Sequence, residues 1–477
     1  MDFDTALETV GDFGWSQIFH LAVLIVPNLC GGFYTISNSF VGKAPHFICA
    51  EKPNEDPCSV QPPCQKFVYD SSFTSIVTEW DLVCEKQQLA ELAQSAFMIG
   101  NFIGCLICGF LGDKFGRLNT GIVCNLLCVL AQMAGAHAQT YEQYAVNRFF
   151  VGFASGGAGL VLATIVLENL RSHWRSVGAT LLCVSFALSI SFTAMWAYRV
   201  REWRAFLWTC NIFMLPFCLV WFVPKSPRWL LSQGRTQEAE DILFNYGHKN
   251  GKITSRDSVK LKPPNGSSVN AEVKSYGAMD AFRTPEMNRR MKILLWGWGT
   301  CGLLYYGLTV SSSNLGGNMY VNVAMSGLVE IPSAFISSFL SNRIGRNRTI
   351  AGSIGLAAVA CLAIVMSSTN SDGAMTTFQT YCAMTAKFGV AAAFSLQGLY
   401  SSELIPTVIR NIGTGFCFMA SRVGGILAPV LIAYCSGVTV YFVYALMSAV
   451  YCLTVLTLPE TLNKPMPENI DDVEAPV

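Results

Sequence analysis

Long apolar runs alternate with short polar segments along almost the whole chain. Each run is about 20 residues long, the length that an α-helix needs to cross the hydrocarbon core of a bilayer. A sliding window of hydropathy predicts about twelve such helices. Their ranges are 17–36, 89–111, 119–138, 143–166, 177–198, 204–223, 291–312, 319–341, 349–368, 375–399, 409–434 and 438–458. The pattern therefore predicts an all-α protein that crosses a membrane many times.

Three short sequence elements recur in the same order in the two halves of this pattern. Each half has a loop motif with a glycine and an arginine, then a glutamate and an arginine at a matched spacing, then a proline-containing motif. The first half carries 112–117, Glu168, Arg175 and 224–228, and the second carries 341–346, Glu403, Arg410 and 459–461. We interpret the halves as duplicated membrane units. Parallel repeats of this kind build many secondary transporters, with the substrate site at the repeat interface.

The longest polar stretch between predicted spans, 224–290, is rich in lysine and arginine, and the loop motifs are also basic. Basic loops mark the cytoplasmic side of a membrane protein, so we expect both termini to be cytoplasmic. The predicted organisation is a cytoplasmic segment 1–16, an N-terminal helix bundle 17–223 with an outer loop 37–88, a cytoplasmic linker 224–290, a C-terminal helix bundle 291–458 and a cytoplasmic tail 459–477.

The composition supports a membrane protein and argues against other classes. Hydrophobic residues make up 52% of the chain and charged residues 13%, against about 25% charged residues in a soluble domain. The net charge of +1 gives no reason to expect a nucleic-acid partner. The sequence contains no HExxH, GxSxG or Walker motif, so we expect neither an enzyme nor a bound cofactor or metal.

Four of the 18 cysteines differ from the rest, which lie mostly within apolar runs. Cys49, Cys58, Cys64 and Cys84 cluster in the polar outer loop, and their number is even. We predict two disulfides that face an oxidising space, with the pairing left open. A zinc site is the weaker alternative, because no CxxC pair supports it.

The loop motifs place charges where two helices meet. Asp113, Lys114 and Arg117 follow the second predicted span, and Arg117 can pair with an acid such as Glu168. We predict a breakable ionic latch between the two bundles; the alternative is a turn whose charges only fix orientation. Asn342 replaces the acid in the second copy, so that latch should be weaker. The remaining predicted latch residues are Arg175, Arg346, Glu403 and Arg410.

Charges inside the predicted spans are candidate substrate contacts, because inserting them into a membrane is costly. They are Glu330, Lys387, Arg422 and Arg148. We predict that Glu330 meets a cationic group and Arg422 a carboxylate in a central cavity. The alternative, favoured for Arg148, is that these charges pair with each other or with backbone carbonyls. Tyr305 can add an aromatic face that attracts a cation.

Several further runs resemble solute carrier family 22, the organic cation, carnitine and organic anion transporters of the major facilitator superfamily. These runs are 10–14, 79–84, 226–230 and 403–407 with Arg410 and Asn411, followed by 459–461. The resemblance covers nearly the whole chain. It implies an all-α major facilitator fold, with about twelve transmembrane helices in two bundles of about six, in the plasma membrane. Lys225 and Asn342 depart from the family's usual acids in these motifs.

Within the family, the second half is most similar to the carnitine branch. That resemblance implies a cation site at Glu330 and Tyr305 and a carboxylate site at Arg422, and it adds Asn28 and Tyr400 as substrate positions. We therefore expect a polyspecific transporter of small organic cations or zwitterions, carnitine-like molecules first, that works by alternating access.

Two alternatives to this function stand. One is an organic anion carrier in which Arg422 and Lys387 dominate the site. The other is a membrane sensor or scaffold that transports nothing, which the cost of the intramembrane charges argues against. Sodium coupling, as in carnitine carriers, and transport driven by the membrane potential alone both stay open.

Overall fold

The computed structural model describes residues 3–11, 14–59, 64, 66–253, 255–261, 278–367, 373–464, 467 and 470–474. Nearly all of the regular structure in these residues is helical. The long helices are α2 (Trp15–Ile36), α5 (Gln87–Phe115), α6 (Arg117–Gly135), α7 (Tyr141–Glu168), α8 (Ser172–Arg199), α12 (Pro285–Ser311), α14 (Glu330–Ile344), α15 (Arg346–Ser367), α16 (Gly373–Leu404), α17 (Arg410–Tyr434) and α18 (Gly437–Val455). The shorter helices are α1 (Phe3–Thr9), α3 (Asn38–Val41), α4 (Ile76–Trp80), α9 (Trp203–Thr209), the 3₁₀ helix η2 (Cys210–Phe222), α10 (Pro227–Ser232), α11 (Thr236–Lys249), α13 (Met319–Leu328) and α19 (Asp471–Glu474).

The structure confirms the predicted all-α fold. In the described part of the chain, 11 helical segments are long and apolar enough to cross a membrane, and α16 covers the remaining predicted span, 375–399. The predicted eighth span, 319–341, is divided into α13 and α14. Pro332 has no N–H to donate to the carbonyl of Leu328, which explains a break at this place. The break sets Glu330 at the first turn of α14.

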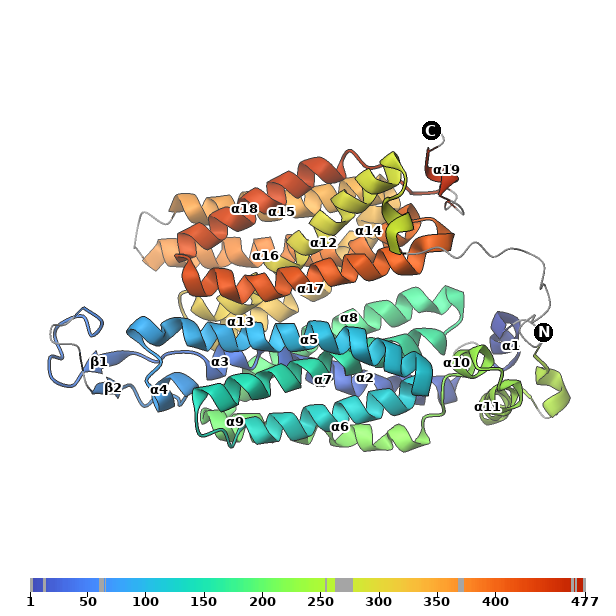
Figure 1. Cartoon of the computed structure of the whole chain (residues 1–477), viewed down its shortest axis with the longest axis horizontal. Coiled ribbons are helices and arrows are strands. Elements are labelled where there is room, and N and C mark those ends of the chain that lie inside the picture. The colour runs from blue at the N-terminus through green and yellow to red at the C-terminus, as the bar shows by residue number, and fades with distance from the viewer. Residues whose placement is uncertain are drawn as a thin grey trace.

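The two halves of the chain form two layers of helices lying side by side (Figure 1). Each layer has a hydrophobic core of its own. The layers meet where α5 packs on α17 and α8 packs on α13. The chain termini lie at one end of this assembly, and the loop that contains β1 and β2 lies at the opposite end (Figure 1).

The loop at the far end is a small, disulfide-linked unit. Strands β1 (Phe47–Cys49) and β2 (Phe67–Tyr69) pair antiparallel, with Phe47 opposite Tyr69. Cys49 is bonded to Cys64 and Cys58 to Cys84. These bonds confirm the predicted disulfides and give their connectivity. All four thiols are used in them, which removes the alternative of a zinc site.

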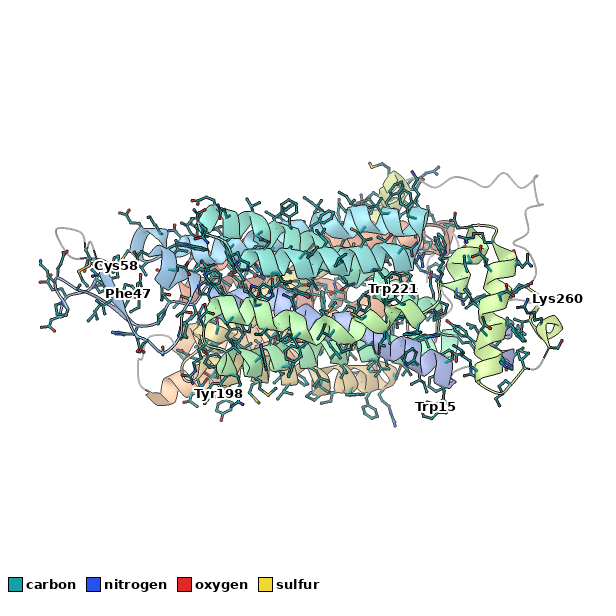
Figure 2. The ribbon with its side chains drawn as sticks, turned by 90° about the horizontal axis from the view of Figure 1, so that it is seen from below. Trp15, Phe47, Cys58, Tyr198, Trp221 and Lys260 are labelled. Atoms are coloured by element: carbon teal, nitrogen blue, oxygen red, sulfur yellow. A yellow bond between two sulfur atoms is a disulfide. The ribbon has the colours of Figure 1, made fainter. Side chains whose placement is uncertain are left out.

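The sides of the two layers carry many exposed large apolar side chains, as the surface of a protein in lipid does. Trp15 and Trp221 are 81% and 79% exposed, and Tyr198 is 49% exposed. Figure 2 shows Trp15 and Tyr198 projecting from the same side of the helices near opposite ends. Aromatic residues at the two ends of membrane helices typically anchor them at the membrane–water interfaces.

The end that contains the termini carries a small apolar cluster outside the spans. Helix α1 packs against α11, and Leu7, Leu230 and Leu243 are buried there. Asn250 joins this cluster to α2, because its amide donates to the Val10 carbonyl (3.1 Å) and to Gln17 Oε1 (2.8 Å). Part of the polar linker predicted at 224–290 is therefore ordered and tied to the first half.

Candidate functional site

The centre of the second half contains a buried ion pair. Lys387 Nζ on α16 lies 2.9 Å from Glu330 Oε1 on α14. Tyr305 on α12 donates its hydroxyl to Glu330 Oε2 at 2.9 Å. The side chains of Lys387 and Glu330 are only 1% and 10% exposed. Three helices thus bring a carboxylate, an ammonium and a tyrosine ring together, and the two charges pair with each other.

Arg422 lies on α17 beside this group and has a different kind of partner. Its Nη1 donates to the Tyr306 hydroxyl at 2.6 Å. Cys105 on α5 is a further hydrogen-bond partner of the guanidinium, and none of the ion pairs described in the structure includes Arg422. The alternative stated for the intramembrane charges, that they pair with each other, therefore describes Glu330 and Lys387 but not Arg422.

A small cavity of about 10 Å³, roughly the volume that one water molecule needs, lies next to these residues, between the two halves. Its wall includes Gln94, Met98 and Phe186 from the first half and Tyr305, Tyr306 and Thr309 from the second. Tyr305 and Tyr306 link the cavity to the charged groups, since Tyr305 binds Glu330 and Tyr306 binds Arg422. This is the position at which a repeat-built transporter holds its substrate.

Arg148 is also buried, but it serves the first half alone. Its guanidinium donates to the Tyr34 carbonyl (3.0 Å), the Ser37 hydroxyl (3.1 Å) and Gln94 Oε1 (2.9 Å). It also lies over the Phe97 ring, 4.5 Å from its centroid. These contacts support the structural role that the sequence favoured for Arg148. They also hold Gln94 where it lines the cavity.

The other two predicted substrate residues lie apart from the ion pair. Asn28 on α2 donates to the Leu182 carbonyl and to Ser185 Oγ, both at 2.6 Å, and so joins α2 to α8. Tyr400 is fully buried and donates to the Pro459 carbonyl at 2.8 Å. That contact belongs to the closing motif of the second half. The structure therefore separates Tyr400 from the central group with which the resemblance had placed it.

The first loop motif forms a network at the end of the molecule where the termini lie. Arg117 pairs with Glu168 and, at 3.1 Å, with Asp113. Ser226 donates to Glu168 Oε2 at 2.7 Å. Gly116 has a φ of +101°, which favours glycine, and it lies against the Trp229 ring. Each of these contacts stays within the first half.

The second loop motif repeats this arrangement within the second half. Arg346 lies 3.6 Å from Glu403 and donates to Asn342 Oδ1 at 2.7 Å. Glu460 accepts from the Arg346 and Asn347 N–H groups at 2.8 and 3.2 Å, where a helix N-terminus favours a carboxylate. Asn342 therefore still binds the arginine of its motif, as an amide in place of an acid.

The remaining predicted latch residues add no bridge to the other half among the described contacts. Lys114 lies over the Phe115 ring at 5.4 Å, and Arg410 donates to the Ile405 carbonyl at 3.3 Å. The side chain of Arg175 lies outside the described residues. The contacts of the two motifs thus brace each half internally. A latch between the bundles stays a prediction about another conformation.

Besides the packing of α5 on α17, several side-chain contacts join the halves toward the end with the disulfides. Lys43 Nζ donates to Asn314 Oδ1 at 2.5 Å, and Phe40 stacks on Tyr320 with ring centroids 5.6 Å apart. Ser191 Oγ donates to the Ala324 carbonyl at 2.8 Å. Burial lowers the pKa of the Lys43 ammonium, and the charge of Glu91 opposes that shift. These contacts join the two halves at that end.

Comparison with known proteins agrees with this architecture. Residues 59–471 match the family described as Sugar (and other) transporter. The inward open conformation of the xylose transporter XylE from E. coli covers 96% of the chain, and 99% of that structure is covered, with a TM-score of 0.66 and 14% identity. At that identity the likeness shows the fold. The fold and the membrane helices define a multi-pass secondary transporter, not an enzyme.

Relatives with higher sequence identity identify the family of transporters to which the chain belongs. The chain is 36% identical to "Solute carrier family 22 member 15-like" of Xenopus laevis, over 100% of the chain and 97% of the relative. It is 32% identical to "Organic anion transporter 3" of Homo sapiens, over 99% and 94%. It is 30% identical to "Organic cation transporter protein" of Drosophila melanogaster, over 99% and 95%. The chain therefore belongs to solute carrier family 22 of the major facilitator superfamily.

Proposed function

We propose that this chain carries small organic ions that bear a carboxylate, zwitterions of the carnitine type first, across the plasma membrane by alternating access. The observation that carries the proposal is the unequal state of the two opposite charges. Glu330 is paired with Lys387, whereas the partners described for Arg422 are the Tyr306 hydroxyl and the side chain of Cys105, neither of which is a carboxylate. Among the described ion pairs, no carboxylate of the protein therefore balances the charge of Arg422.

A substrate carboxylate is the natural partner for this arginine. Placing an arginine at the middle of a membrane helix costs about 2.5–3.5 kcal/mol on insertion scales. A carboxylate can accept two parallel N–H bonds from a guanidinium, and such bonds are about twice as strong as neutral ones. The cavity lined by Tyr305 and Tyr306 supplies the aromatic wall for the rest of the molecule.

The ammonium of a zwitterion has Glu330 and the Tyr305 ring as partners, in competition with Lys387. A plain organic cation would meet the same competition and would also face the charge of Arg422. The plain cations expected from the sequence therefore gain less support from this geometry than zwitterions. The organic anion alternative gains support, since Lys387 neutralises Glu330, and it is the second candidate.

The proposal also includes the orientation of the chain in the membrane. The basic loop motifs lie at the end of the molecule that contains the termini, and we place that end in the cytoplasm. The disulfide loop then faces the oxidising exterior.

The proposal is tested by uptake into cells that express the chain, comparing labelled carnitine, para-aminohippurate and tetraethylammonium, each with and without sodium. We expect carnitine to accumulate above the level of vector-transfected cells, and para-aminohippurate to follow it. The effect of sodium on carnitine uptake decides between ion-coupled and uncoupled transport. Uptake of tetraethylammonium alone would contradict the proposal.

A further inference from the structure

Lys387 has the surroundings of a bound ligand. Besides its ion pair with Glu330, its Nζ donates to Thr309 Oγ1 at 2.6 Å and to the Tyr305 carbonyl at 3.3 Å. The same Nζ lies 3.4 Å from the centroid of the Tyr305 ring. Its side chain is 1% exposed. The ammonium thus has a carboxylate, two oxygen acceptors and an aromatic ring around it.

These are the groups that would recognise an ammonium from solution. A cation within about 6 Å of an aromatic centroid is attracted by the ring, and a carboxylate adds the attraction of its opposite charge, which a quaternary ammonium without N–H groups also receives. Tyr305 also stacks on Phe394, with ring centroids 5.4 Å apart. Lys387 therefore fills the position that the sequence predicted for a substrate cation at Glu330 and Tyr305.

We propose that Lys387 is a tethered occupant of the cation position, and that it sets the charge selectivity of the transporter. While it is in place, Glu330 is neutralised and Arg422 is the charge left for a substrate. An incoming ammonium has to displace Lys387 from Glu330. This inference rests on the proposed function, since it concerns the same site.

The presence of Lys387 at Glu330 explains why a zwitterion should be taken up faster than a plain cation. A zwitterion whose carboxylate is held by Arg422 presents its ammonium to Glu330 at a high effective concentration, as any second linked contact does. A plain cation has no such anchor and competes with Lys387 from solution. An anion needs only Arg422 and does not meet this competition. The predicted order of preference is zwitterions and anions ahead of plain cations.

The test is initial uptake of tetraethylammonium, carnitine and para-aminohippurate, normalised to the amount of protein at the cell surface, in K387M and K387R. K387M removes the tethered cation and keeps the length of the side chain. We expect its ratio of tetraethylammonium to para-aminohippurate uptake to rise about tenfold, the effect of one lost interaction of ordinary strength. K387R keeps a cation and should change this ratio far less. The matched control is K66M, at an exposed lysine of the outer loop.

A second variant keeps the test decisive if K387M does not reach the surface. E330Q leaves Lys387 its contacts with Thr309 and Tyr305 but removes the carboxylate for which the two ammonium groups compete. We expect E330Q to lower carnitine uptake about tenfold relative to para-aminohippurate uptake. A pair with a purely structural role would instead lower both substrates together.

The outcomes separate this inference from the proposed function. An unchanged ratio of tetraethylammonium to para-aminohippurate in K387M at normal surface level would overturn the role of Lys387, while carnitine and para-aminohippurate uptake by the unaltered chain would still support the proposed function. If the unaltered chain takes up tetraethylammonium and neither carboxylate substrate, the proposed function itself fails, and the inference fails with it.

Discussion

The two halves of the molecule carry the same motifs but contribute differently to its centre. The first half buries Arg148, and three oxygens of that half accept its hydrogen bonds. The second half supplies Glu330, Lys387 and Arg422, and its arginine has no acid partner among the described ion pairs. A buried cation with a full set of internal acceptors holds a helix bundle together. A buried cation without an anion is available to a ligand.

The networks of the two loop motifs sharpen this contrast, since both halves complete them. Arg117 has Glu168, and Arg346 has Glu403. Each acid also accepts a hydrogen bond from a hydroxyl, Ser226 or Thr461. The duplicated motifs therefore stabilise each half internally. The charged group at the centre is not duplicated, since among the described residues only the second half has it.

The largest effect on stability should come from Arg148. R148M leaves the Tyr34 carbonyl, Ser37 and Gln94 without their donor, and each unsatisfied buried group costs about 1–3 kcal/mol. We expect a steep fall in the thermal midpoint of the purified protein and in its surface level. The protein that does reach the surface should keep the ratio of carnitine to para-aminohippurate uptake. R343M, at an exposed arginine, is the control; a changed ratio in R148M would give Arg148 a place in the substrate site.

Substitution of Arg422 should have the opposite effect, with a large loss of substrate uptake and little loss of stability. R422A removes the carboxylate contact, and the loss of a charged hydrogen bond of about 1.5–3 kcal/mol lowers uptake of carnitine and para-aminohippurate about tenfold or more. The thermal midpoint should change little, since the described partners that it leaves are the Tyr306 hydroxyl and the side chain of Cys105, and neither is a carboxylate. R422K keeps the charge and should retain part of the uptake. Equal carnitine uptake in R422A and the unaltered chain would contradict the account.

A smaller effect is expected in the network of the second loop motif. Gly345 has a φ of +104°, and a Cβ there would lie 2.2 Å from Glu460 Oε2. G345A should therefore destabilise the protein by roughly 1–3 kcal/mol, the usual cost of a side chain in such a backbone conformation. The control is G352A, because a Cβ at Gly352 meets nothing within 4 Å. Equal thermal midpoints for the two variants would show that Glu460 does not brace this turn.

The smallest effect should come from the contact that joins the halves at the outer end. N314A removes the acceptor of Lys43, a contact of about 1 kcal/mol, which corresponds to roughly a fivefold shift in a two-state equilibrium. We expect faster labelling of Y320C by a membrane-impermeant maleimide applied from outside in the N314A background. The same labelling rate with and without the N314A substitution would mean that this hydrogen bond does not hold the outer end closed.

Much of the frame could be predicted from the sequence because it depends on local patterns. Apolar runs of the right length predicted the membrane helices, and the recurring motifs predicted the two halves. The polar surroundings of Cys49, Cys58, Cys64 and Cys84 predicted disulfides, but their pairing depends on how the loop folds back along the β1–β2 hairpin.

The charged residues of the centre could be identified from the sequence, but their partners could not. Which side of α14, α16 and α17 faces which neighbour depends on packing between distant helices, so pairing among these charges was stated only as an alternative, without naming Lys387 as the partner of Glu330. Thr309 was missed as well, although it lies one helical turn after Tyr305 on the same face, which was a usable signal. Tyr400 was placed at the substrate by resemblance, whereas its position near the end of α16 brings it to Pro459.

The central claim is that the substrate is held by its carboxylate at Arg422. The most direct measurement compares carnitine with its methyl ester as competitors of labelled carnitine uptake in cells that express the unaltered chain. The ester keeps the quaternary ammonium and removes the negative charge. We predict that it competes about tenfold more weakly than carnitine, or weaker still. An ester that competes as well as carnitine would contradict the account and return the leading role to Glu330 as a cation site.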